Sequence, residues 1–132
     1  MKRKKLKKIK ESKLDEITSL YVRTQKNFTC ERCGKHIEPP TNQIQCSHFH
    51  SRSLRSVRYE LDNLDCLCSD CHWFFEKRKT TDYTDWKLKK LGKKRFEALK
   101  RKAYRSSEIK IGVLTQTEKQ IILAKYKLTQ LK

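Results

Sequence analysis

The sequence predicts a small α+β domain in which a cysteine-rich centre lies between basic helices. Its 132 residues suit one domain, and an apolar content of 36% supports only a small core. Apolar residues recur at helical spacing before and after the centre, and two Cys-x2-Cys pairs lie within it. A formal charge of +18 indicates a polyanionic partner, most commonly nucleic acid.

The charge is unevenly distributed along the chain. Residues 1–26 carry ten basic and three acidic side chains, residues 27–83 carry eight of each, and residues 84–132 carry fifteen and four. Every Cys and His lies in the neutral centre. We therefore predict a basic tail over 1–11, a helix over 12–26, a chemically active module over 27–80 and a basic helical extension over 81–132.

The composition also bears on the compartment. No run of about 18 apolar residues occurs, and the N-terminus lacks an apolar signal segment, so neither a membrane span nor a secretory signal is expected. We predict a cytoplasmic protein. In that reducing compartment, the six cysteines favour metal binding over disulfides.

The N-terminal segment combines a tail and a helix. The basic run over 2–10 is typical either of a solvated tail or of an arm on DNA. Ser12 with Asp15 fits a capping box, and apolar residues then follow at helical spacing up to about Gln25: Leu14, Ile17, Leu20 and Tyr21. This stripe predicts a core-covering helix with no chemical role.

The extension predicts two or three helices. The first begins at Thr81 or Thr84 and ends or bends at Gly92. Its apolar positions are Trp86, Leu88 and Leu91. A second helix from Lys93 carries Phe96, Leu99 and Ala103, and a third, capped by Thr115 and Glu118, carries Ile121, Ala124, Leu128 and Leu131. That last stripe docks either on the core or on a second copy, which would give a homodimer.

The cysteine pairs have the spacing of a zinc site. Cys30 with Cys33 and Cys68 with Cys71 each place two sulfurs in one tight turn, where both reach the same tetrahedral Zn²⁺ at about 2.3 Å. The ion would stabilise a core this small. Cys46 and Cys66 stand outside the pairs, and core packing is the favoured interpretation for both, with replacement of a ligand as the alternative.

Three residues of the centre, His48, Asn63 and His72, stand in a run Asn-Leu-x2-Leu-Cys-x2-Cys-His that resembles the signature of HNH nucleases. The resemblance implies a strand–loop–strand–helix module, the ββα-metal fold, stapled by the structural zinc. It implies that His48 is the general base, that Asn63 braces the loop and that His72 binds a catalytic Mg²⁺ or Mn²⁺.

Within that superfamily, residues 28–100 resemble the phage NinG/Rap recombination endonucleases and related phage HNH proteins. Three stretches carry this likeness: Ser47-His48-Phe49, Arg58-Tyr59-x3-Asn63, and Gly92 followed by Phe96-Glu97-Ala98-Leu99. The likeness implies cleavage of duplex or branched DNA in DNA recombination, in the cytoplasm of a host cell.

Imidazole chemistry suits the implied reaction, because a neutral ring with a pKa near 6.5 can take a proton from water and contribute on the order of 10²–10⁴ in rate. Many HNH enzymes have Asp or His immediately before the general base, where that residue binds the metal. This chain has Ser47 at that position. Glu76, one helical turn after His72, or His50, on the strand face of His48, is expected to supply the missing ligand.

Basic residues are the candidate DNA contacts. Arg52, Arg55 and Arg58 stand three apart, and guanidinium groups grip phosphate bidentately. Lys93, Lys94 and Arg95 begin the second basic helix. A non-catalytic zinc module that binds nucleic acid is the alternative function, because loss of the ligand at Ser47 could mean loss of the metal.

Overall fold

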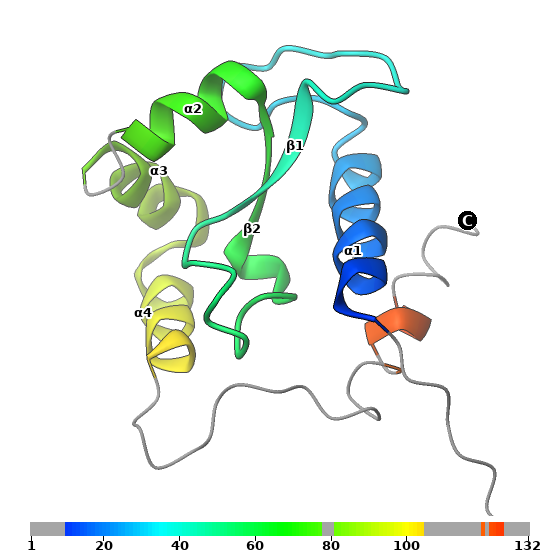
Figure 1. The fold of residues 1–132 in the computed structure, drawn as a ribbon. Coiled ribbons are helices and arrows are strands. Elements are labelled where there is room, and N and C mark those ends of the chain that lie inside the picture. Colours follow the sequence, from blue (N-terminus) through cyan, green and yellow to red (C-terminus); the bar gives the residue numbers. More distant parts are fainter. Residues whose placement is uncertain (1–9, 78–80, 105–119, 121, 126–132) are drawn as a thin grey trace, which may run out of the picture.

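The computed structural model describes residues 10–77, 81–104, 120 and 122–125. The elements are α1 (Glu11–Gln25), β1 (Ile44–His48), the 3-10 helix η1 (Leu61–Asn63), β2 (Leu64–Cys68), α2 (Ser69–Lys77), α3 (Asp82–Leu91) and α4 (Lys93–Ala103). In these ranges the fold is the predicted mixture of helices with a small sheet of two strands. The strands lie between α1 and the group α2 to α4 (Figure 1).

Helix α1 begins without the predicted cap. Ser12 lies inside its first turn, and Lys10 takes the N-cap position without a side-chain hydrogen bond. The Lys10 carbonyl instead accepts the N–H groups of Lys13 and Leu14, so the N-cap lies two residues earlier than expected. The predicted apolar stripe is buried at Leu14 and Ile17, whereas Leu20 is 40% exposed. Val22, which the predicted stripe did not include, is buried instead.

The two strands are antiparallel, with His48 opposite Leu64 and Ile44 opposite Cys68. Every residue of β2 is buried, because α1 covers one side of the strand and α2 with α3 covers the other. Helix α2 starts at the residue that follows β2. This junction places Cys68 at the end of a strand and Cys71 in the first turn of a helix.

Helices α3 and α4 meet at Gly92, whose φ of 79° ends α3 as predicted. Leu99 and Ala103 of α4 pack on Val57 and Leu91 in a second, smaller core. The predicted apolar stripe of α3 is wrong at Leu88, which is 38% exposed. The buried positions are Tyr83, Lys87 and Leu91, because Lys87 meets a buried carboxylate that the sequence pattern does not reveal.

Several expectations fall outside the described residues. They include the basic tail before residue 10, the cap at Thr115 and Glu118, and the positions Leu128 and Leu131 of the last helix. Residues 122–125 are helical. Among the described residues, no helix has the length and apolar content needed to cross a membrane.

Candidate functional site

The four paired cysteines converge on one point. Their sulfur atoms all lie within 4.8 Å of one another, and the Cys33 and Cys68 sulfurs are 3.7 Å apart. Four thiolates about 2.3 Å from a tetrahedral Zn²⁺ would be separated by about 3.8 Å, so the cluster has the size of a zinc site. The structure thus brings together the residues whose spacing predicted the site, and they could hold a metal such as zinc.

Each cysteine pair forms a tight turn. The N–H of Cys33 lies 3.5 Å from the Cys30 sulfur, and the N–H of Cys71 lies 3.4 Å from the Cys68 sulfur. Gly34, with a φ of 80°, lets the first turn close by donating its N–H to the Cys30 carbonyl at 2.9 Å. Each turn therefore contributes two sulfurs to the cluster and one N–H group close to a sulfur.

The pKa values of the cluster cysteines shift in opposite directions. Burial raises the pKa of Cys68 and raises that of Cys71 to about 12. Burial also acts to raise the pKa of Cys30, but backbone N–H groups, that of Cys33 first, lower it to about 7. Arg32 donates to the Cys71 sulfur at 3.4 Å and lies 4.1 Å from the centre of the Phe74 ring. A guanidinium held in place by an aromatic ring therefore offsets part of the negative charge of four thiolates.

The two remaining cysteines pack in the core, which is the interpretation that the sequence favoured. Cys66 is fully buried and Cys46 packs against the same cluster. Burial raises the pKa of each thiol to about 12. Both therefore stay protonated and neutral at physiological pH, and neither belongs to the four-cysteine group.

His48 and Asn63 lie at the two ends of one braced loop. The buried side chain of Asn63 accepts the N–H of His50 at 2.7 Å and donates to the carbonyls of His50 and Val57, each at 3.1 Å. The His48 Nε2 lies 3.0 Å from the carbonyl oxygen of Arg58 within this loop. Because a carbonyl only accepts, Nε2 carries the proton and Nδ1 keeps the lone pair.

Burial lowers the pKa of His48, against the opposing effect of the hydrogen bond to the Arg58 carbonyl. A neutral ring is therefore favoured at physiological pH. The combination of a fixed tautomer and a neutral ring gives His48 the state that proton abstraction requires.

The three arginines of the loop differ in environment. Arg58 forms a bidentate ion pair with Asp15 at 2.9 and 2.5 Å and lies 3.3 Å from Glu11, and its side chain is 9% exposed. The expectation that Arg58 contacts DNA is therefore wrong, because α1 carboxylates already occupy its guanidinium. Arg55 pairs with Glu11 at 3.1 Å, whereas Arg52 is 67% exposed and 3.9 Å from Asp15.

His72 makes its contacts with β1 and with its own helix. Its Nδ1 contacts the Gln45 Oε1 at 2.5 Å, and its Nε2 lies 3.8 Å from the Glu76 Oε1. Gln45 precedes His48 by three residues in β1. The structure thus places His72 beside Glu76, one of the two residues expected to supply the missing ligand.

His50 does not join either group. Strand β1 ends at His48, so the expected shared strand face is absent. The His50 ring lies 4.7 Å from that of Phe49 and 5.3 Å from that of Tyr104, and its buried Nε2 has no hydrogen-bond partner among the described residues. Within those residues, the four cysteines form the one group of three or more close Cys, His, Asp or Glu ligands.

A buried polar network lies beside Ser47. The Ser47 hydroxyl is 3.0 Å from that of Tyr83, which donates to Asp65 at 2.6 Å. Lys87 and Lys90 donate to the other Asp65 oxygen at 2.8 and 2.6 Å. Ser47 is thus engaged in linking α3 to the sheet.

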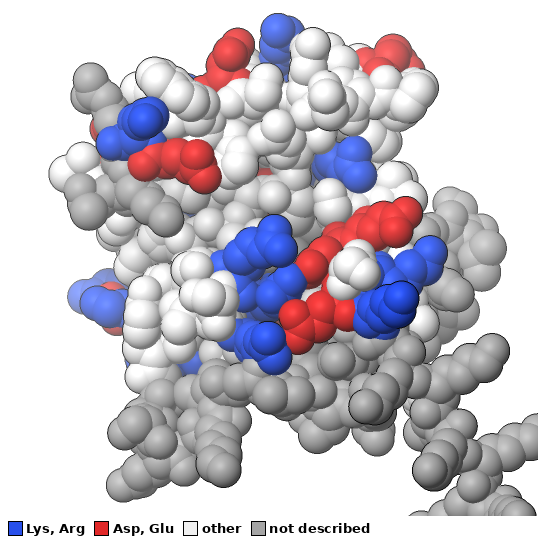
Figure 2. All heavy atoms as spheres, viewed as in Figure 1, with Lys and Arg blue, Asp and Glu red and all other residues white. Residues whose placement is uncertain are grey.

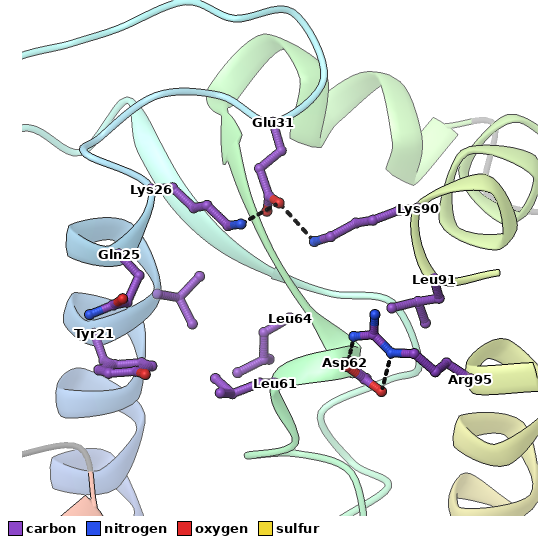
Figure 3. Close-up of a pocket in the computed structure, with 11 residues that line it drawn as sticks. Tyr21, Gln25, Lys26, Glu31, Leu61, Asp62, Leu64, Lys90, Leu91 and Arg95 are labelled. Atoms are coloured by element: carbon purple, nitrogen blue, oxygen red, sulfur yellow. Dashed lines mark hydrogen bonds and ion pairs between the residues drawn. The ribbon is translucent and has the colours of Figure 1, made fainter. Parts of the chain in front are cut away.

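A pocket lies between α1, the start of β2 and the junction of α3 with α4 (Figure 3). Its floor is apolar, with Leu64 and Leu91 among the lining residues. Its basic side chains are already paired: Arg95 points to Asp62, and Lys26 and Lys90 point to Glu31. Arg95 was a predicted DNA contact, and this ion pair engages it at one edge of the pocket.

Basic and acidic side chains lie next to each other across the middle of one face, without a uniform basic surface (Figure 2). Three acids pair with basic side chains of distant segments: Glu11 with Arg55, Asp15 with Arg58, and Asp65 with Lys87. One signal was available: Glu11 and Asp15 stand four apart in an otherwise basic segment, which places them on one helix face. The local sequence around Lys87 contains no such signal that this side chain is buried in an ion pair.

Comparison of the chain with protein-family models, with curated proteins and with solved structures gave no match.

Proposed function

We propose that this protein is a metal-dependent DNA endonuclease of the HNH kind in which His48 activates water. One observation carries the proposal: the His48 ring donates Nε2–H to a loop carbonyl, inside a loop that Asn63 braces. The order β1, loop, β2, α2 and the adjacent cysteine cluster agree with the ββα-metal module that the sequence resembles.

In this mechanism the lone pair on His48 Nδ1 takes a proton from the attacking water, and the Arg58 carbonyl stabilises the proton already on Nε2. His72 and Glu76 would hold a divalent cation, Mg²⁺ or Mn²⁺, and their 3.8 Å separation suits two ligands of one ion. Bound there, such an ion would polarise the phosphate and neutralise developing charge. The cysteine-bound zinc would have a structural role only.

Helix α4 offers the surface for the DNA backbone, because its basic side chains fall into two sets. Arg95 and Lys102 pair with Asp62 and Glu60 of the loop and η1. The other set is exposed and has no acidic partner among the described residues: Lys93, Lys94, Lys100 and Arg101. We assign phosphate contacts to this second set, and to exposed Arg52 beside the loop.

Replacing His48 by alanine is expected to reduce plasmid nicking in Mg²⁺ or Mn²⁺ by on the order of 10²–10⁴, the usual contribution of a general base. Zinc content and DNA affinity should stay at the wild-type level, since His48 contacts neither the cysteine cluster nor α4's exposed cations. Nicking rates on supercoiled plasmid, with zinc measured by atomic absorption, test this. Undiminished nicking by the purified variant would contradict the proposed role of His48.

Replacing Lys100 and Arg101 together by alanine should weaken DNA binding uniformly across sequences. It should also reduce the slope of log K against log salt by about two, one for each lost phosphate contact. The control variant Arg95→Ala/Lys102→Ala removes the same charge from the paired set and should change the slope less. Fluorescence anisotropy over a salt series measures both, and equal slopes for the two variants would rule out the proposed division of α4.

A non-catalytic zinc module that binds nucleic acid is the second candidate. The hydrogen bond between Ser47 and Tyr83 favours it, because that contact occupies the hydroxyl at the position where the family resemblance implies a metal ligand. Calorimetric titration of the zinc-loaded protein with Mn²⁺ separates the candidates. The endonuclease should bind one Mn²⁺, with loss of binding in His72→Ala, whereas the module should bind none.

The substrate and assembly of the enzyme follow from the same proposal. Its resemblance to phage recombination nucleases supports branched DNA as well as duplex DNA as the substrate, and one active site would cut one strand. Cleavage of both strands would need a homodimer, for which the last helix was the predicted surface. A panel of nicked, flap, fork and four-way junction substrates, with the mass of the protein measured in solution, distinguishes these cases.

A further inference from the structure

Arg58 links His48 to α1. The backbone carbonyl of Arg58 accepts the His48 Nε2–H at 3.0 Å, and its guanidinium is gripped by Asp15 at 2.9 and 2.5 Å. The same residue therefore holds the ring through its backbone and is itself held through its side chain. Helix α1 lies outside the strand–loop–strand–helix segment that carries the motif.

We infer that Asp15 is a positioning residue for His48, acting through Arg58. This inference rests on the proposed function, since it assigns Asp15 a part in the same reaction. Asp15 holds Arg58 by two hydrogen bonds and, in the proposed mechanism, does not contact the DNA. By fixing Arg58 it would fix the carbonyl that selects which ring nitrogen carries the proton.

The contacts of the loop explain why the Asp15–Arg58 ion pair would affect His48. Asn63 anchors the loop at His50 and Val57, and the carbonyl that receives His48 comes one residue after Val57. The bidentate Asp15–Arg58 pair has defined planar geometry, and Arg58 is nearly buried, so its position is tightly restricted. Release of the guanidinium would let the carbonyl rotate, and the neutral ring could then exchange its proton between Nδ1 and Nε2.

The test compares two isosteric substitutions on α1. Asp15→Asn keeps the shape of the side chain and removes the charge that Arg58 needs. Glu16→Gln, the next residue, removes the same charge at an exposed position with no partner among the described residues. Arg58→Lys is the second variant, in case Asp15→Asn fails to fold: it keeps the positive charge but loses the bidentate grip.

Two readouts are needed. Long-range ¹H–¹⁵N correlation spectra of the His48 ring, recorded where the ring is neutral, report the tautomer without any reaction. Wild type and Glu16→Gln should show the Nε2–H form, whereas Asp15→Asn and Arg58→Lys should show both forms. In plasmid nicking, kcat should fall by about 10–100-fold in these two variants, the usual loss for an outer partner of a catalytic histidine, with KM for DNA unchanged.

The outcomes separate the inference from the proposed function. An unchanged Nε2–H tautomer in folded Asp15→Asn and in Arg58→Lys would overturn the positioning role, whatever the nicking rates. A rise in KM with unchanged kcat would overturn it as well, because Asp15 would then act on DNA binding. A mixed tautomer in these variants, with no nicking even by wild type, would support the positioning role and refute the endonuclease.

Discussion

Replacing Cys68 by serine is expected to abolish metal binding by the four-cysteine cluster and to unfold the chain. The Cys68 sulfur is buried in the four-cysteine cluster, 3.7 Å from that of Cys33, and a hydroxyl is a poor ligand for Zn²⁺. Structural zinc contributes about 10–16 kcal/mol of apparent binding free energy, which matches or exceeds the whole stability of a small domain at about 5–15 kcal/mol. Zinc content and far-ultraviolet circular dichroism measure the two losses.

Cys46→Ala is the matched control, because it removes a thiol from the same core without touching the cluster. It should bind one zinc per chain and lose only about 1 kcal/mol of stability, on the scale of a small core truncation. A Cys68→Ser variant that is folded and zinc-loaded like this control would show that the cluster does not stabilise the fold.

Replacing Asp65 by alanine should have the next largest effect, a loss of about 3–5 kcal/mol in the free energy of unfolding. Asp65 and Lys87 are both fully buried, so the substitution leaves an ammonium group inside the protein without its carboxylate. Burial already lowers the pKa of Lys87, although Asp65 opposes that shift. Urea titration followed by tryptophan fluorescence gives the difference in stability.

Asp62→Ala provides the comparison, since Asp62 also pairs with a basic residue of the extension, but in solvent. Its loss should cost less than about 1 kcal/mol, as for exposed ion pairs. The double variant Asp65→Asn/Lys87→Met removes both buried charges and should recover much of the stability lost in Asp65→Ala. Equal losses in Asp65→Ala and Asp62→Ala would contradict the stabilising role of the buried pair.

The features that sequence could predict are local ones. The spacing of Cys30 with Cys33 and of Cys68 with Cys71 requires only two tight turns, and the structure brings all four sulfurs together. The helix break at Gly92 follows equally from one residue's preference for positive φ. For the same reason the loop brace by Asn63, adjacent in sequence to β2, agrees with the expectation from the motif.

The features that sequence missed depend on partners distant in the chain. The sequence predicts that Arg58 contacts phosphate, but its guanidinium binds Asp15, 43 residues earlier. The sequence pattern places Lys87 in solvent, but in the core its ammonium group donates a hydrogen bond to Asp65, 22 residues earlier. A charged side chain is buried only where its counter-ion is placed by the tertiary fold, so periodicity alone assigns both residues to the surface.

The ion pair between Asp65 and Lys87, with that between Asp15 and Arg58, sets the smallest fragment worth expressing. A fragment cut at the motif boundaries, residues 27–80, would retain Asp65 and Arg58 but lose Lys87 and Asp15. The same cut would remove Val22 of α1 and Tyr83 of α3 and would expose the core that they help to form. The segment that carries the motif is therefore shorter than the folding unit, and an expressed fragment must extend at least from α1 to α3.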